Sequence, residues 1–340
     1  MESFAIGEEE YSWRLRNNFG IDETPAQIHQ KGLELAAKIR ARMEVLARQI
    51  DPSKDLAGVM ADLKADHPVD DKAMMARYVE LADRARDFVI RERMFDLPPD
   101  YKLKITETPP GMRSTISMAA YNPAPPLEKG RNGAFLVTPT EGNERKLSMH
   151  SDARMASIVV HEAFPGHDLQ YYEFQHGAEV SPVRYLPRIN YARSLNVEGY
   201  ALYAEELMRQ HGFYTPKEEL AQLGMQIWRA YRLVVDTGLH TGRMSFQAAV
   251  DTLAKQAFLA LPIAEAEAYR YTTMPLQAIT YMMGRLQIEG LKEKYKAILG
   301  PDYSEAQFHK DFLSFGPVPP AMIEPVLLDQ ARRRRAGAGS

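Results

Sequence analysis

The sequence predicts a mainly α-helical protein with one small β-sheet. Apolar residues recur at helical spacing over residues 24–50 and 70–93, and again from residue 152 to about residue 330. Between residues 101 and 139 the pattern changes to short β-prone runs, LKITETPP, RSTISMAAY and GAFLVTP, separated by turns rich in Pro and Gly. These observations indicate a helical body, with the sheet placed just before its last and longest helical region.

Capping residues mark where several of these helices begin. Thr24 is suited to cap the first long helix, Pro25 fits its first turn, and Gln27 stands where a capping box requires it. The segments 215–218 and 304–307 show the same pattern. We therefore expect helices to begin at these three places.

No repeat or low-complexity stretch divides the chain, so we expect a single domain over residues 1–330. It would consist of a helical part (1–100), a sheet region (101–150) and a helical part that carries the functional site (151–330). Residues 331–340 are basic and rich in Gly and Ala, which predicts a disordered tail.

The composition excludes several classes of function. The 340 residues carry a net charge of -3, which gives no support for a nucleic-acid partner or an anionic membrane surface. There is no cysteine, so disulfides, a thiol nucleophile and a Cys-ligated zinc site are excluded. The N-terminal MESFAIGEEEY has no apolar signal region and no window is apolar enough to span a bilayer. We expect a cytoplasmic protein, although a segment upstream of this chain could be missing.

The run ASIVVHEAFPGHDLQ indicates a metal site. In an H-E-x-x-H motif two histidines four residues apart share one helix face and the glutamate is the general base. Here His161 and His167 are six residues apart, which would leave their rings about 120° apart on an unbroken helix. The helix must therefore be deformed, and Pro165 and Gly166 occupy the interval where the deformation is needed. Glu162 is then the predicted base.

A purely structural interpretation of this run is a helix that ends at a Pro-Gly turn and carries two surface histidines. The apolar residues Ile158, Val159 and Val160 favour the metal site instead. They indicate that the following polar residues are buried and need a partner. Asp168 could orient a ligand imidazole or could be an ordinary surface charge.

A catalytic zinc ion usually has three protein ligands and one open position. The best candidate for the third ligand is Glu198 in NVEGYALYAEEL, where the adjacent Gly199 permits a close helix approach. Glu205 and Glu206 are alternatives, but they lie two turns further on and are better suited to a place behind the ligands or facing solvent. The two His and one Glu favour one Zn²⁺ per chain, while cobalt and manganese stay open as alternatives.

HEAFPGHDLQ followed by NVEGYALYAEEL resembles the bacterial family called domain of unknown function 885, which is grouped with the zincin-type metallopeptidases. The blocks VVDTGLHTGRMSFQAAVD, EAYRYTTMPLQAITYMMG and FHKDFLSFGPVPPAMIEPVL resemble later blocks of the family in the same order, and YSWRLRNNFGIDETPAQIHQKG resembles its preceding helical block. The resemblance implies a helical zincin-like body similar to carboxypeptidase Taq and the thimet oligopeptidases, with a deep channel and a small sheet beside the metal. It also supports Glu198 as the third ligand.

The chain differs from the family pattern at several positions. Family members are usually longer at the N-terminus. Asp168 stands where a further histidine is common, Leu276 where glycine is common, and Met282 where lysine is frequent. We expect these differences to affect the choice of substrate, since the metal motif itself is complete.

Further candidates for the site lie in the blocks that match the family. His240 and Tyr281 are candidate donors to the oxyanion of an amide-hydrolysis intermediate. Their structural alternatives are a histidine at a helix C-terminus and an ordinary tyrosine at the edge of the core. Arg270, Tyr271 and Gln277 are candidates for binding the substrate, because a guanidinium suits a carboxylate. A surface ion pair with an acidic neighbour is the alternative for the arginine.

Two further features of the sequence lie outside these candidate site residues. Arg232 and Asp236 are spaced to brace their own helix rather than to contact substrate. The strand GAFLVTP could pair with an extended peptide as an added strand, or could simply cover the core.

These residues lead to three hypotheses for function. The first is a zinc metallopeptidase of short peptides, in which Glu162 activates the water and His240 or Tyr281 stabilises the intermediate. The second is a zinc-dependent hydrolase of an amide in a small metabolite, and the third is a protein that binds peptides without cleaving them. A homodimer is possible, with no nucleic acid or membrane as partner.

Overall fold

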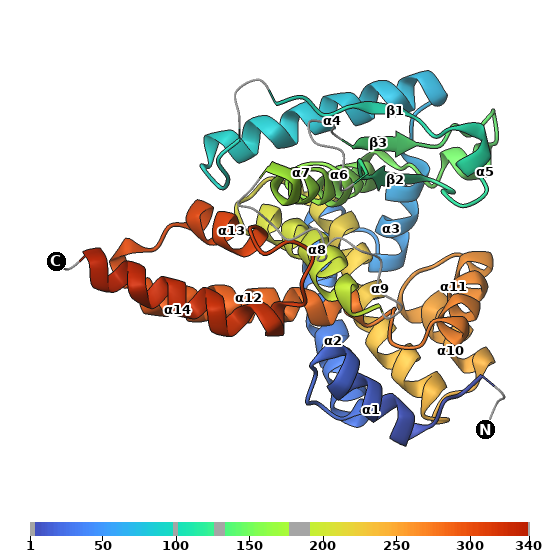
Figure 1. Cartoon of the computed structure of the whole chain (residues 1–340). Helices are drawn as coiled ribbons and strands as arrows, with labels where there is room; N and C mark the ends of the chain where they lie inside the picture. The colour runs from blue at the N-terminus through green and yellow to red at the C-terminus, as the bar shows by residue number, and fades with distance from the viewer. Residues whose placement is uncertain (1–3, 98–100, 126–132, 177–190, 339–340) are drawn as a thin grey trace.

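The computed structural model describes residues 4–97, 101–125, 133–176 and 191–338. They form a helical body with a three-stranded sheet beside α6 (Figure 1). The elements are α1 (Glu8–Phe19), α2 (Pro25–Ile50), α3 (Leu56–Ala65), α4 (Asp71–Arg91), β1 (Ile105–Glu107), β2 (Ala119–Asn122), β3 (Ala134–Val137), α5 (Glu144–Leu147), α6 (Asp152–Glu162), α7 (His167–His176), α8 (Ser194–Gln210), α9 (Pro216–His240), α10 (Phe246–Gln256), α11 (Leu261–Thr273), α12 (Thr280–Leu299), α13 (Glu305–Leu313) and α14 (Pro320–Ala338), with short 3-10 helices at Pro110–Met112, Tyr191–Arg193 and Gly300–Asp302. The predicted mainly α-helical class is confirmed.

The predicted helix starts are present. At the start of α2, Thr24 and Gln27 form the predicted capping box, and the segment 215–218 forms a second one at the start of α9. At α13 the cap is only one-sided: Ser304 accepts a hydrogen bond from the backbone of Gln307, but the Gln307 side chain donates to Asp311 at 2.7 Å. Local sequence therefore determines where these helices begin.

Two helix pairs place the site. Helix α2 packs along α9, and α8 packs along α12 (Figure 1). The second crossing depends on two glycines, because a Cβ on Gly199 would lie 2.6 Å from the backbone of Gly284. The predicted close helix approach at Gly199 is thereby confirmed. The crossing brings Glu198 on α8 and Tyr281 on α12 to one cavity.

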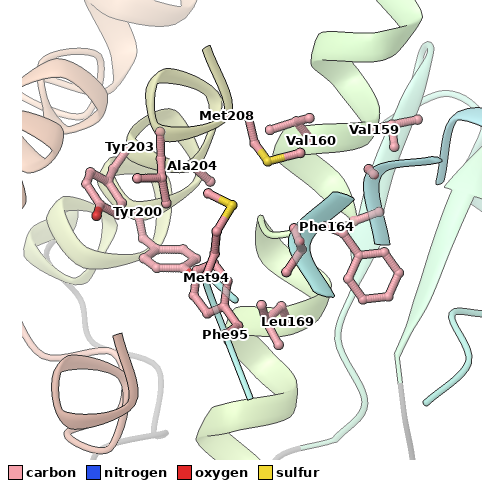
Figure 2. Close-up of a cluster of buried hydrophobic side chains, with 14 of the residues drawn as sticks. Met94, Phe95, Val159, Val160, Phe164, Leu169, Tyr200, Tyr203, Ala204 and Met208 are labelled. Atoms are coloured by element: carbon pink, nitrogen blue, oxygen red, sulfur yellow. The ribbon is translucent and has the colours of Figure 1, made fainter. Parts of the chain in front are cut away.

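The apolar residues before the histidine motif belong to the core. Figure 2 shows the labelled side chains of this cluster between the segment 94–95, α6, α7 and α8: Met94, Phe95, Val159, Val160, Phe164, Leu169, Tyr200, Tyr203, Ala204 and Met208. Every one of them is less than a tenth exposed. This packing fixes the C-terminal end of α6, where the motif begins.

The sheet has the strand order β1-β3-β2, with β1 parallel and β2 antiparallel to β3. Strand β3 is the predicted GAFLVTP strand, and both of its edges are already paired. The prediction that this strand could receive an extended peptide is therefore wrong. Within the described residues the unpaired edge that lies near the histidine motif belongs to β2, where Tyr121 opposes Phe135.

The C-terminal segment was expected to be a disordered tail, and this is wrong for residues 331–338. Helix α14 continues to Ala338, and Arg334 forms an ion pair with Asp311 at 2.5 Å. Residues 339–340 lie outside the described part of the chain. None of the described helices is long and apolar enough to cross a membrane.

Candidate metal centre

The chain breaks its helix between the two histidines. Helix α6 ends at Glu162 and α7 begins at His167, with a cis peptide bond between Phe164 and Pro165. A Cβ on Gly166 would lie 2.0 Å from the carbonyl oxygen of His161, so only glycine fits there. The predicted deformation is confirmed, and it turns the two imidazole rings toward one another at a centroid distance of 4.9 Å.

Three candidate ligand atoms converge at this point. Oε2 of Glu198 lies 3.5 Å from Nε2 of His161 and 3.6 Å from Nε2 of His167. One ligand atom from each residue lies within 4.8 Å of the other two. A tetrahedral ion with bonds of about 2.0–2.1 Å would separate its ligand atoms by roughly 3.4 Å. The three residues therefore fit a zinc-sized ion.

The residue behind His161 fixes the orientation of its ring. Nδ1 of His161 lies 2.8 Å from Oε1 of Glu205, whose other oxygen accepts a hydrogen bond from Ser157 at 3.0 Å. Because a carboxylate only accepts, Nδ1 carries a hydrogen, and Nε2 is the nitrogen that a metal ion would bind. Glu206 points elsewhere and pairs with Arg209 at 2.6 Å. Neither of these two glutamates competes with Glu198.

His167 is oriented through a chain of amides. Its Nδ1 lies 3.3 Å from Oε1 of Gln170, and the amide of Gln170 donates to Asn196 at 3.1 Å.

Neither expectation for Asp168 holds: it is buried, and it accepts a hydrogen bond from Tyr101 instead of facing an imidazole or solvent. Burial raises the pKa of Asp168 to about 7.

Without a metal ion a proton is favoured on His161. Burial lowers the pKa of His161, but hydrogen bonds to Glu198 and Glu205 outweigh it and raise the pKa to about 10. Burial alone would raise the pKa of Glu198, yet its hydrogen bonds to the two histidines hold it well below the usual range. A cation is therefore favoured among these side chains, whether it is a proton or a metal ion.

Glu162 lies between the candidate metal ligands and the sheet. Its Oε2 accepts a hydrogen bond of 2.7 Å from the backbone N–H of Tyr121 on β2. It faces a cavity of about 290 Å³, which also exposes the three ligand residues. The cavity is lined by Met118, Ala119, Ala120, Tyr121, Arg154, Ser157, Ile158, His161, Glu162, His167, Glu198, Glu205, Met225, Arg229, Arg232 and Tyr281.

The structure separates the two predicted oxyanion donors. Tyr281 lines the cavity. His240 does not, because its ring is fully buried and its Nε2 lies 2.9 Å from the carbonyl oxygen of Tyr271. It also stacks on Tyr11. The structure therefore brings only one of the two candidates to the metal ligands.

The predicted substrate-binding residues lie outside the wall of this cavity. Arg270 pairs with Glu267 at 2.9 Å, as its structural alternative expects, and also donates to Gln277. Tyr271 is fully buried and its hydroxyl donates to Glu267 at 2.7 Å. Arg270 and Gln277 connect α11 to the loop that follows it, and Tyr271 connects α11 to α9 by accepting from Arg232 at 2.9 Å.

Three arginines in the cavity wall were not predicted. Arg154 lies two helical turns before His161, and Arg229 and Arg232 lie one turn apart on α9. The expected brace between Arg232 and Asp236 within α9 does not form among the described residues: Arg232 pairs with Glu267 at 3.2 Å, and Asp236 accepts from Tyr11 at 2.6 Å. The spacing of seven residues to His161 was the available signal, because it places Arg154 on the same helix face.

Comparison with known proteins gives the family. Residues 2–327 match the family described as "Bacterial protein of unknown function (DUF885)". No curated protein matches the chain significantly. Among solved structures, the "putative lipoprotein from Colwellia psychrerythraea" has a TM-score of 0.80 at 25% identity, over 97% of this chain and 57% of its own.

A second solved structure, "a putative lipoprotein of unknown function from Shewanella oneidensis", has a TM-score of 0.81 at 22% identity, over 96% of this chain and 60% of its own. The chain thus spans less than two thirds of the length of either structure. The fold is shared with both, and the match to the family covers almost all of the sequence. The chain belongs to the DUF885 family of bacterial proteins.

Proposed function

We propose that the protein is a zinc-dependent hydrolase that cleaves peptide bonds of short peptides, with Glu162 as general base. One observation carries the proposal: the ligand atoms of His161, His167 and Glu198 converge within 4.8 Å beside Glu162 in one cavity. Two imidazoles and a carboxylate, with a further carboxylate beside them, are the donor set of zinc hydrolases. The resemblance to zincin-type metallopeptidases supports the same conclusion.

The position of Glu162 suits proton transfer. Its Oε2 is held by the N–H of Tyr121, which leaves Oε1 able to take a proton from a water in the cavity. The same carboxyl group then gives this proton to the leaving amine. A bound zinc ion would supply Lewis acidity and lower the pKa of the water.

Tyr281 is the proposed donor to the substrate carbonyl oxygen. Burial and the nearby carboxylate of Glu198 raise its pKa, so the hydroxyl keeps its proton at neutral pH. A donor that faces the developing negative charge stabilises the intermediate. The chain therefore offers both a base and a proton donor at one cavity.

The edge of β2 is the proposed place for the peptide backbone. Residues 119 and 121 turn their backbone groups away from β3, since residues alternate along an antiparallel pair and Met118 bonds to Thr138 across it. Both residues line the cavity, but the N–H of Tyr121 already donates to Glu162, so a substrate would pair with the backbone of Ala119. An extended substrate that pairs with this edge would pass next to Glu162.

The test is metal analysis together with cleavage of a mixed short-peptide library by the wild type and by Glu162→Gln. We expect about one zinc per chain in both proteins, and cleavage only in the wild type. General-base catalysis contributes about 10²–10⁴ in rate, so the variant should fall by at least 100-fold. Absence of bound metal after zinc reconstitution would overturn the ligand assignment.

A second candidate is hydrolysis of an amide in a small metabolite. The observation that favours it is the size of the cavity, about 290 Å³, which is at the lower end for small-molecule sites. Stoichiometric zinc without cleavage of any peptide would support this candidate. Peptide binding that is equally strong in Glu162→Gln, with no cleavage by either protein, would instead indicate a binding protein without activity.

The location of the protein also becomes a proposal. The two similar structures carry the name lipoprotein, which supports a location outside the cytoplasm rather than the cytoplasmic one expected from the sequence. Fractionation of cells that express the complete natural gene, with detection of this chain by antibody, tests both. Gel filtration of the purified chain tests the predicted homodimer.

A further inference from the structure

Three buried or half-buried arginines share the cavity with the candidate metal ligands. Arg229 and Arg232 are 6% and 4% exposed, and Arg154 is half-buried. A guanidinium in such a place loses most of its hydration, which costs several kcal/mol unless a counter-charge replaces the water. The presence of three such groups in one wall therefore calls for a negative partner.

Among the described residues, a carboxylate pairs with one of the three, Arg232. Arg232 pairs with Glu267 at 3.2 Å and donates to the hydroxyl of Tyr271 at 2.9 Å. Arg229 donates to the backbone of Met225 at 3.1 Å. Over the described residues, no carboxylate lies within ion-pair distance of Arg229 or Arg154.

Several of their N–H groups have no partner in the described structure. These are Nε of Arg154, Nε of Arg229 and Nη1 of Arg232, all of them buried. Nearly all buried donors in proteins are hydrogen-bonded, so each exception needs a reason. The protein therefore leaves the hydrogen bonding of all three guanidinium groups incomplete.

The charges also act on one another. Burial and then the charge of Arg229 lower the pKa of Arg154 to about 10. Burial and then Arg232 lower the pKa of Arg229. The three positive charges are therefore close together and only partly compensated.

The glutamates in the same wall are already engaged. Glu198 lies between the two histidines, Glu205 binds His161 and Ser157, and Glu162 accepts from the backbone of Tyr121. A divalent ion would add two further positive charges. The remaining requirement of the cavity is an anion.

We infer that the substrate carries a carboxylate close to the scissile amide, and that Arg154, Arg229 and Arg232 bind it. This inference rests on the proposed peptidase function and names the substrate class of that site. A guanidinium matches the two oxygens of a carboxylate with parallel N–H groups. The small cavity leaves room for about one or two residues beside the metal ligands. The carboxylate belongs either to the C-terminus of the peptide or to an acidic side chain.

Binding to the zinc-free protein tests this inference without cleavage and without a metal that could itself bind a carboxylate. The probes are acetyl-Ala-Ala with a free C-terminus, the same peptide as its C-terminal amide, and acetyl-Ala-Glu-amide, all measured by calorimetry. We expect at least one of the two acidic peptides to bind tenfold or more tightly than the neutral amide. A preference for the free C-terminus would make the enzyme a carboxypeptidase, and a preference for the Glu peptide would assign the site to an acidic side chain.

The matched variants are Arg229→Gln and Arg154→Gln, with the exposed Arg48→Gln as control. We expect the first two to abolish the preference for the acidic peptide and the control to keep it. Arg229→Lys keeps the positive charge but cannot donate two parallel N–H groups to one carboxylate. This variant should therefore keep part of the preference for the acidic peptide that Arg229→Gln loses. Thermal unfolding of each variant shows whether it is folded, and the comparison of peptides on the wild type stands even if one variant is not.

Equal binding of all three peptides to the wild type would overturn the inference. Cleavage assays with the zinc-loaded enzyme then distinguish a failure of this inference from a failure of the proposed function. Cleavage of neutral and acidic peptides at equal efficiency would retain the peptidase and reject the carboxylate site. Selective binding of an acidic peptide without any cleavage would retain the carboxylate site and reject the peptidase.

Discussion

Gly166 lies so close to His161 that a Cβ on the glycine would be 2.0 Å from the histidine's carbonyl oxygen. This contact closes the loop between α6 and α7 and lets His167 face His161 across 4.9 Å. The two extra residues in the motif are thus accommodated by a helix break rather than by a kink.

Gly166→Ala should therefore weaken the metal centre. The added methyl group must push the loop away from α6, which moves His167 relative to His161. We expect a loss of zinc affinity of at least tenfold, measured by competition with a chromogenic chelator. Gly111→Ala is the matched control, because nothing lies within 4 Å of its Cβ position. Equal zinc affinity of both variants would show that the loop does not determine the ligand geometry.

Glu205 and Glu206 allow a comparison between neighbouring residues of the same type. Glu205 holds Nδ1 of His161 at 2.8 Å, and Glu206 pairs with Arg209 and Gln226 on another face of α8. Glu205→Gln should lower zinc affinity by about 10–100-fold, the usual effect of removing a carboxylate behind a ligand histidine.

Glu206→Gln should leave zinc affinity unchanged and lower only the stability of the fold. Chelator competition and thermal unfolding of both variants separate the two effects. An equal change of zinc affinity in the two variants would mean that Glu205 acts through the general charge of α8, and not through His161.

Tyr281 and His240 were predicted together, and their positions now lead to opposite expectations. Tyr281→Phe removes only a hydroxyl from the cavity wall and keeps the ring that lies under Arg232 at 4.4 Å. We expect kcat to fall by about 10²–10³ with little change of unfolding temperature, since one oxyanion donor contributes this much.

His240→Gln should keep kcat within about twofold. It should lose roughly 1–3 kcal/mol of stability, because the buried hydrogen bond to the carbonyl of Tyr271 is disturbed. Steady-state kinetics and denaturant unfolding of both variants decide between them. A large loss of kcat in His240→Gln, without loss of stability, would indicate that His240 is an oxyanion donor after all.

The part of the structure that could be predicted is the part determined by local sequence. The caps at Thr24 and Thr215, the helix break at Gly166 and the ligand candidate Glu198 each depend on a few neighbouring residues. The buried position of the histidine motif followed from the three apolar residues before it.

The remaining features depend on packing between distant segments. Strand β3 was expected to offer an edge, but only the pairing order shows that β2 does. Arg229 and His240 lie on the same helix, three turns apart, and sequence alone could not tell which one faces the cavity. The tail after residue 330 was predicted to be disordered from its composition, yet α14 continues to Ala338 and its Arg334 pairs with Asp311 on α13.

Zinc affinity should increase with pH. The pKa of His161 is about 10 in the metal-free protein, because hydrogen bonds to Glu198 and Glu205 outweigh the effect of burial. At neutral pH zinc must therefore displace a proton from this ring. We expect the dissociation constant to fall by about tenfold for each unit between pH 6 and pH 8, with about one proton released per zinc. Calorimetry in buffers of different ionisation enthalpy counts that proton, and a dissociation constant independent of pH would contradict the protonation of His161 in the metal-free protein.

Stability should decrease in acid because of His309. This imidazole is fully buried, with Nδ1 bonded to the carbonyl of Met94 at 2.9 Å and Nε2 to the hydroxyl of Tyr203 at 2.7 Å. In the neutral form Nδ1–H donates to the carbonyl and Nε2 accepts from the hydroxyl, and burial lowers the pKa to about 4 from the ordinary 6.5. The folded state therefore binds its proton at lower pH than the unfolded state does.

The stabilisation by the neutral ring is complete above pH 6.5 and is lost as the pH falls from 6.5 through 4, by roughly 3 kcal/mol in total. His309→Gln cannot take up this proton. We expect the variant to be less stable than the wild type at pH 7 but to lose less of its unfolding free energy between pH 6.5 and pH 4. Urea unfolding at four or five pH values measures both slopes. If the slopes are equal, another group is responsible for the acid sensitivity, and His150, whose pKa burial also lowers to about 4, is the next residue to replace.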